Sequence, residues 1–179
     1  LGQSLGRRKV RFIEASSAEF GFEVALLDGS QVTTVTVPKD ASRMFTCYKV
    51  GSGAVPIEPP RGQWDFVVTK YTHQFYEPFM PYLVTGVLSA NVVRVAVVPD
   101  AELENVTLAD TLAHPFRTSR DAIGYDWKYY SFETSSYIVD RNKVYIVQDM
   151  DGHFFKLHFV DFYNEQGRAG CPQFEVVPL

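Results

Sequence analysis

Cysteine and long apolar runs are both scarce in this 179-residue chain, and each shortage excludes a class of site. Cys47 and Cys171 are the only cysteines, too few for a disulfide framework or for a zinc site built from thiolates. A single bridge between them stays open, because pairing needs a close approach that the sequence does not show. No apolar run approaches the ~20 residues of a membrane-spanning helix. The sequence therefore predicts neither a thiolate metal centre nor a transmembrane segment.

Clusters of positive charge are also missing. The formal net charge is −4, and the 17 lysines and arginines are scattered, apart from Arg7-Arg8-Lys9 near the start. Proteins that follow a phosphate backbone carry a basic stripe or patch. We therefore expect no nucleic-acid partner.

Enzyme signatures form no constellation in this sequence. There is no glycine-rich phosphate-binding loop and no helical His-Glu-x-x-His motif, two patterns that mark nucleotide and zinc enzymes. The acidic pairs Glu102/Glu104 and Asp149/Asp151 lie where a helix start and a turn are expected, and solvated charge explains them. The sequence thus predicts a protein without a catalytic step.

Aromatic and β-branched residues, by contrast, are abundant. Hydrophobic residues make up 46% of the chain and aromatic residues 15%, enough to fold around a core of its own. The pattern predicts a single domain over residues 1–179, all-β, mostly antiparallel and sandwich-like, with one short helix at 100–113 capped by Asp100 and ended by His114-Pro115. Strands are expected within 20–37 (two, joined at Asp28-Gly29), 43–53, 63–71, 82–88, 92–98, 125–133, 136–140 and 144–179.

The stretch VYIVQDMDGHFFKLHF, residues 144–159, raises the question whether His153 and His158 form a metal site. Asp151-Gly152 favours a tight two-residue turn, which would pair Val144 with Phe159, Ile146 with Leu157 and Gln148 with Phe155, and would place Tyr145 opposite His158 and Val147 opposite Lys156. Side chains alternate faces along a strand, so two histidines five residues apart point to opposite faces. We therefore expect that they do not bind one ion together.

Two segments, 72–81 and 111–122, are predicted to interrupt the β pattern as long loops, which often carry binding residues. The first contains His73 and Met80 and the second contains His114, and imidazole and thioether groups are among the side chains that bind haem iron axially. The surrounding residues could supply apolar walls (Phe75, Tyr76, Phe79, Phe116) and cations for the haem carboxylates (Lys70, Arg117, Arg120). A proline-bounded loop that packs its aromatic residues onto the sheet explains the same pattern equally well.

A recognisable set of residues recurs through the C-terminal stretch 123–179: Ile123-Gly124, Trp127-Lys128, Tyr145-Ile146-Val147, Asp151-Gly152, Phe155-Lys156-Leu157, Phe162-Tyr163-Asn164, Gly167 and Gly170. With these residues, the stretch resembles the HmuY family of bacterial cell-envelope proteins. Residues 64–71 and 82–88 are also similar to the family pattern.

This resemblance implies an all-β protein that is exported and is either secreted or anchored in the outer membrane by a lipid. It implies a haemophore-like function, in which haem lies between two loops, two side chains bind the iron, and an outer-membrane receptor receives the haem. By region, the implied axial ligands are His114 on one face with His73 or Met80 on the other. The alternative is a surface protein of the same fold that binds another small ligand or a partner protein, with Phe75, Tyr76 and Phe79 as an aromatic contact patch.

Overall fold

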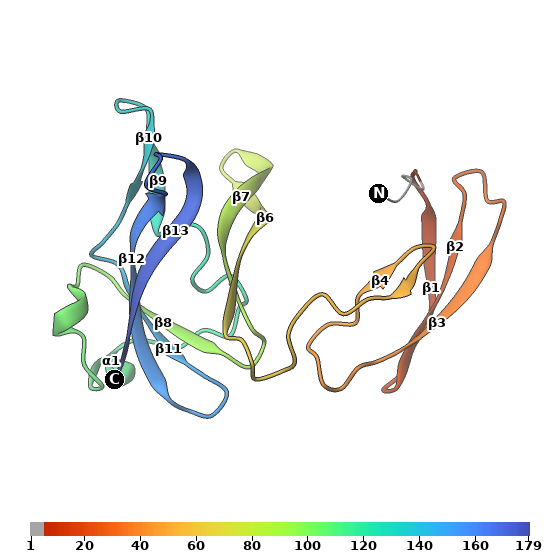
Figure 1. The fold of residues 1–179 in the computed structure, drawn as a ribbon, viewed down its shortest axis with the longest axis horizontal. Coiled ribbons are helices and arrows are strands. Elements are labelled where there is room, and N and C mark those ends of the chain that lie inside the picture. The colour runs from red at the N-terminus through yellow and green to blue at the C-terminus, as the bar shows by residue number, and fades with distance from the viewer. Residues whose placement is uncertain (1–5) are drawn as a thin grey trace. The chain divides into compact units, whose positions relative to one another are not determined.

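The computed structural model describes residues 6–179. The chain divides into two compact units, Leu1–Gln63 and Trp64–Leu179, and both are built almost entirely from antiparallel strands (Figure 1). The all-β prediction is therefore confirmed. Whether the two units behave as the single domain expected from the sequence stays a prediction. No helix among residues 6–179 is long and apolar enough to cross a membrane, and Cys47 and Cys171 are both free thiols.

The first unit is a three-stranded sheet followed by a small ribbon. The central strand β2 pairs with both neighbours, and its Phe22 and Val24 form a small core with Val37. The turn expected at Asp28-Gly29 is present, with the Asp28 carboxylate accepting the Ser30 N–H. The strand expected over 43–53 is reduced to a two-residue pairing. The elements are β1 Lys9–Ala15, β2 Glu19–Ala25, β3 Thr33–Pro38, β4 Tyr48–Lys49 and β5 Gly53–Ala54.

The second unit is organised by a four-stranded antiparallel sheet in the order β13-β12-β11-β8. Its inner strand β11 is buried on both faces, because all four residues 144–147 are 3% exposed or less. The sheet must therefore be covered by chain on each side. Its strands are β8 Arg94–Val98, β11 Val144–Gln148, β12 Phe154–Tyr163 and β13 Ala169–Pro178.

The register predicted for the β11–β12 hairpin is wrong by one residue. Tyr145 pairs with Leu157, and Val144 pairs with His158. The Asp149 N–H donates to the His153 carbonyl at 3.0 Å, so the loop has three residues and ends in Gly152 at φ +90°. This is the turn-plus-bulge loop rather than the two-residue turn, and a shift of one residue exchanges the faces of a whole strand.

One face of the sheet is covered by residues between 101 and 116. Leu103 and Val106 pack there against Val144 and Ile146. The single helix expected over 100–113 is instead a 3-10 turn, η1 Leu103–Asn105, and one short helix, α1 Asp110–Ala113. Asp100 is not the N-cap, since its φ of +53° differs from the extended backbone of a cap. The chain is extended again at Val106 (φ −76°, ψ 130°), and this break lets Leu103 and Val106 both reach the sheet.

The other face carries Trp127, which stacks on Phe159 at 4.0 Å between ring centroids, and a long hairpin. The hairpin consists of β6 Phe66–Tyr76 and β7 Phe79–Ser89, and Phe66 contacts Phe174 of β13 at 5.4 Å. The loop predicted over 72–81 is therefore wrong, because the ladder continues to the pair Tyr76–Phe79. Pro81 is tolerated because a two-stranded ribbon has only edge strands.

Candidate ligand-binding groove

A groove of about 780 Å³ lies between two hairpins of the second unit. One wall is the β6–β7 hairpin, and the other is the hairpin of β9 Lys128–Ser131 and β10 Ser136–Val139. The volume lies within the usual range for small-molecule sites, roughly 300–1,000 Å³. The lining residues are mostly aromatic: Lys70, Phe75, Tyr82, Leu83, Val84, Thr85, Tyr125, Asp126, Lys128, Tyr129, Tyr130, Phe132 and Tyr137.

Three charged side chains line this groove, and they differ in their surroundings. Lys70 is exposed. Asp126 forms an ion pair with Lys143 at 2.7 Å, which offsets its charge. Lys128 is buried at 7% exposure, and its ammonium group lies over the Trp127 ring at 4.2 Å from the centroid. The groove therefore combines aromatic walls with an excess of positive charge.

Burial has an electrostatic consequence for Lys128. Desolvation lowers the pKa of its ammonium group to about 8, while the nearby Asp126 carboxylate opposes this shift. The Nζ atom donates to the backbone carbonyls of Thr85 at 2.6 Å and Tyr125 at 3.4 Å. The buried charge is thus held by two carbonyl dipoles that both line the groove.

The stability of the protein should accordingly increase with pH in the weakly alkaline range. The folded chain releases the Lys128 proton near pH 8, whereas the unfolded chain keeps it to about 10.4, so unfolding takes up a proton between these values. We expect the free energy of unfolding in urea to rise by about 1 kcal/mol from pH 7.5 to 9.5 relative to Lys128→Met. Equal slopes in the two proteins would contradict this assignment.

His73 and Met80 lie on the same face of the β6–β7 hairpin, because Phe75 is opposite Met80 and His73 is opposite Tyr82. The centroid of the His73 ring lies 4.9 Å from that of Phe75 and 4.8 Å from that of Tyr125. His73 also lines a smaller pocket of about 290 Å³ beside the groove, together with Arg117 and the groove residue Tyr125. His73 and Tyr125 thus lie at the boundary between the groove and this pocket.

His114 lies in a different part of the fold. It caps the C-terminal end of α1, and Phe116, two residues later, contacts Phe154 at 5.9 Å in the cluster on the opposite face of the sheet. The backbone of Arg117 pairs with Val95 at the sheet edge. Within residues 6–179, no hydrogen bond or ring contact joins His114 to His73 or Met80.

The remaining predicted residues are distributed around the hairpins. Phe75 and Lys70 line the groove. Tyr76 and Phe79 are exposed at the hairpin tip, and their ring centroids are 6.2 Å apart. The backbone carbonyl of Arg120 accepts a hydrogen bond from the N–H of Ser89, the last residue of β7, at 2.6 Å.

Sequence reasoning missed the second wall of the groove. The sequence patterns predict no binding role for Lys128, although the segment WKYYSF surrounds this lysine with aromatic residues. They predict none for Tyr125 either, yet its ring contacts those of His73 and Phe75. The density of tyrosines next to a lysine between two strand-like runs was the available signal.

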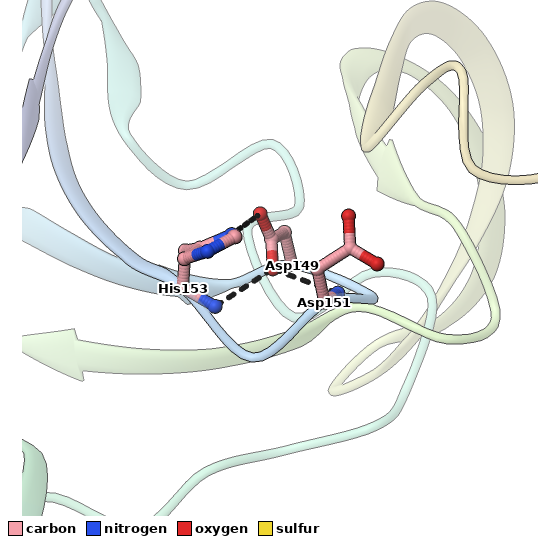
Figure 2. A group of neighbouring side chains, drawn as sticks. All are labelled: Asp149, Asp151 and His153. Carbon is pink, nitrogen blue, oxygen red and sulfur yellow. Dashed lines mark hydrogen bonds and ion pairs between the residues drawn. The ribbon is translucent and has the colours of Figure 1, made fainter.

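His153 and His158 have separate partners. His158 contacts the Glu175 carboxylate at 3.1 Å and the Arg141 carbonyl at 3.1 Å. Figure 2 shows His153 beside Asp149 and Asp151, whose potential ligand atoms all lie within 4.8 Å of one another. Asp149 already accepts the backbone N–H groups of Asp151 and His153 at 2.9 and 2.8 Å. This cluster holds the three-residue turn in shape.

The comparisons with known proteins give one family match, which lies in the C-terminal part of the chain. Residues 92–176 match the family model described as HmuY protein; the matched segment includes the four-stranded sheet, the β9–β10 wall and Lys128, but not the β6–β7 hairpin. No curated protein matches the chain. A crystal structure of a Tannerella forsythia apo HmuY analog matches at 15% identity over 97% of both chains, with a TM-score of 0.29. The similarity to the HmuY family thus lies in residues 92–176 of the chain.

Proposed function

We propose that this protein binds haem without catalysing a reaction, and that the groove between the β6–β7 and β9–β10 hairpins receives the porphyrin ring. The observation that carries the proposal is the groove itself, whose volume of about 780 Å³ and aromatic lining suit a large, flat, apolar ligand. The match of residues 92–176 to the HmuY family model supports the same ligand class, since the HmuY resemblance implies haem.

The donor groups near the groove fit haem iron. Haem supplies a ferric or ferrous ion with two axial positions, and imidazole and thioether are established axial ligands. His73 lies beside the groove in contact with Phe75 and Tyr125, and Met80 lies on the same hairpin face. The aromatic rings of Phe75, Tyr82 and Tyr125 are the proposed apolar walls.

We propose His73 as the first axial ligand, with Met80 or His114 as the second. Met80 is the nearer candidate, because it is a diagonal neighbour of His73 across the hairpin. Met80 pairs with Phe75, which lies two residues after His73 on the same face. His114 would need residues 111–122 to leave the edge of the sheet, where Arg117 and Val95 exchange hydrogen bonds of 3.0 and 2.8 Å. Arg117, which lines the pocket beside His73, is the predicted cation for a haem carboxylate on that side.

The cellular setting belongs to the proposal as well. The family implies an exported protein of the cell envelope, secreted or lipid-anchored at the outer membrane, that passes haem to an outer-membrane receptor. The proposal assigns no particular residue to the anchor or to the receptor contact.

Titration of the protein with haemin, followed at the Soret band, tests this function. We expect a saturable six-coordinate spectrum, and at least a roughly tenfold weaker affinity for His73→Ala because an axial bond is lost. Met80→Ala and His114→Ala identify the second ligand, and the triple variant should give the spectrum of free haemin. Exposed His153→Ala, which lies in the β11–β12 turn, is the control and should bind haemin as the parent protein does.

The alternative function is favoured by one specific observation. Tyr76 and Phe79 at the β6–β7 tip are 76% and 75% exposed, and exposed aromatic residues are enriched at contact surfaces. A haemin spectrum identical to that of free haemin would leave the family assignment unchanged. It would move the function to another small ligand, or to a partner protein bound through this tip.

A further inference from the structure

Lys128 is a buried cation in the lining of an aromatic groove. Its side chain is largely removed from solvent, since only 7% of the residue remains exposed, and it lies close to the rings of Trp127 at 4.2 Å and Phe162 at 4.7 Å. Burying an ammonium group is costly unless its donors are satisfied. Position 128 therefore retains a charge at a place where an apolar side chain would pack at lower cost.

The hydrogen bonds of Lys128 leave part of its donor capacity for a ligand. An ammonium group has three N–H donors, and within residues 6–179 the partners of Nζ are two, the carbonyls of Thr85 and Tyr125. All three residues line the groove. The third donor has no hydrogen-bond partner among these residues, and an acceptor that enters the groove could satisfy it.

We propose that Lys128 binds a carboxylate of the ligand and makes the groove selective for flat aromatic acids over their uncharged analogues. The inference rests on the proposed function and deepens it, because haem itself carries two carboxylates. It assigns one of them to a residue on the β9–β10 wall, whereas the sequence pointed to Lys70, Arg117 and Arg120.

The charges around the groove support this choice. Asp126, the one acidic residue of the lining, is engaged with Lys143 at 2.7 Å. Lys70 also lines the groove but is exposed, and exposed ion pairs contribute little because water competes for them. A charge-assisted hydrogen bond formed in a desolvated site is stronger than one formed in water. Lys128 should therefore dominate the recognition of an anion.

Metal-free protoporphyrin IX and its dimethyl ester provide the test, because they share one ring system and differ in the two carboxylates. Binding is measured by quenching of tryptophan fluorescence. The unmodified protein is expected to bind the acid at least roughly tenfold more tightly than the ester. Lys128→Met should reduce this ratio to near one while the affinity for the ester changes little. Lys49→Met, at an exposed lysine outside the groove, should keep the ratio.

Two results would overturn the inference: equal binding of acid and ester by the unmodified protein, or a preference for the acid that survives in Lys128→Met. Lys128→Gln is the second variant should the methionine protein fail to unfold cooperatively, since its amide still donates to one carbonyl but carries no charge. The same loss of the ratio is expected for it.

Failure of the proposed function gives a different pattern. If neither porphyrin quenches the unmodified protein, haem-type ligands do not enter the groove. The pair 8-anilinonaphthalene-1-sulfonate and N-phenyl-1-naphthylamine, one anionic and one neutral, then tests Lys128 alone by ligand fluorescence. A preference for the sulfonate that is lost in Lys128→Met supports the inference, and its absence overturns it.

Discussion

Replacing Trp127 by alanine is expected to lower the free energy of unfolding by about 3–5 kcal/mol. The Trp127 side chain is completely buried, stacks on Phe159 at 4.0 Å and meets Phe162 edge-on at 5.6 Å. Its removal leaves a cavity between the four-stranded sheet and the β9 strand that begins at the next residue. Lys128 would also lose the ring over which its ammonium group lies.

Urea unfolding followed by far-ultraviolet circular dichroism measures this effect. Phe132→Ala is the matched control, because it removes a large aromatic ring that is 89% exposed at the edge of the same groove. Its effect should stay within about 0.5 kcal/mol. A loss below about 1 kcal/mol for Trp127→Ala would mean that the packing around Phe159 does not hold the second unit together.

The general architecture could be predicted from the sequence because strand formation depends on local patterns. Alternating apolar residues bounded by Gly and Pro marked most strands, and the all-β assignment followed. Register was harder, because it depended on whether Gly152 ends a two-residue or a three-residue loop. The hydrogen bonds that select the longer loop are accepted by the Asp149 carboxylate. In the sequence, Asp149 is indistinguishable from any solvated acidic residue of a turn.

The candidate site was predictable only in part, for a related reason. His73, Phe75 and Lys70 do lie in or beside the groove, although their segment is a hairpin and not a loop. The prolines at 78 and 81 suggested an interruption, since Pro cannot donate to a ladder, but a two-stranded ribbon accommodates them. The groove itself requires β7 and β9, which are distant in sequence, to face each other, and no local pattern encodes that approach.

The second large effect concerns the contact between β7 and residue 124. Gly86→Ala should lower the free energy of unfolding by about 3 kcal/mol. A Cβ atom at position 86 would lie 2.5 Å from the Gly124 carbonyl oxygen and 3.0 Å from the Tyr71 ring. Relief of these overlaps requires β7 to separate from residue 124, although the neighbouring Val87 exchanges hydrogen bonds of 2.8 and 3.1 Å with Gly124. Overpacking of this kind typically costs about 1–3 kcal/mol or more.

The control for this prediction is Gly152→Ala, which separates the steric cost from the conformational cost of replacing a glycine. Gly152 has φ +90° and no atom within 4 Å of the position that a Cβ would take, whereas Gly86 lacks a positive φ and has the close contacts. Gly152→Ala should therefore cost only about 1–2 kcal/mol, the cost of a left-handed backbone for alanine. Because Tyr125 follows Gly124 and lines the groove, Gly86→Ala should also weaken porphyrin binding, while Gly152→Ala should leave it unchanged. Equal losses of stability in the two variants would show that β7 and residue 124 are free to separate, and that the wall of the groove is not fixed by this contact.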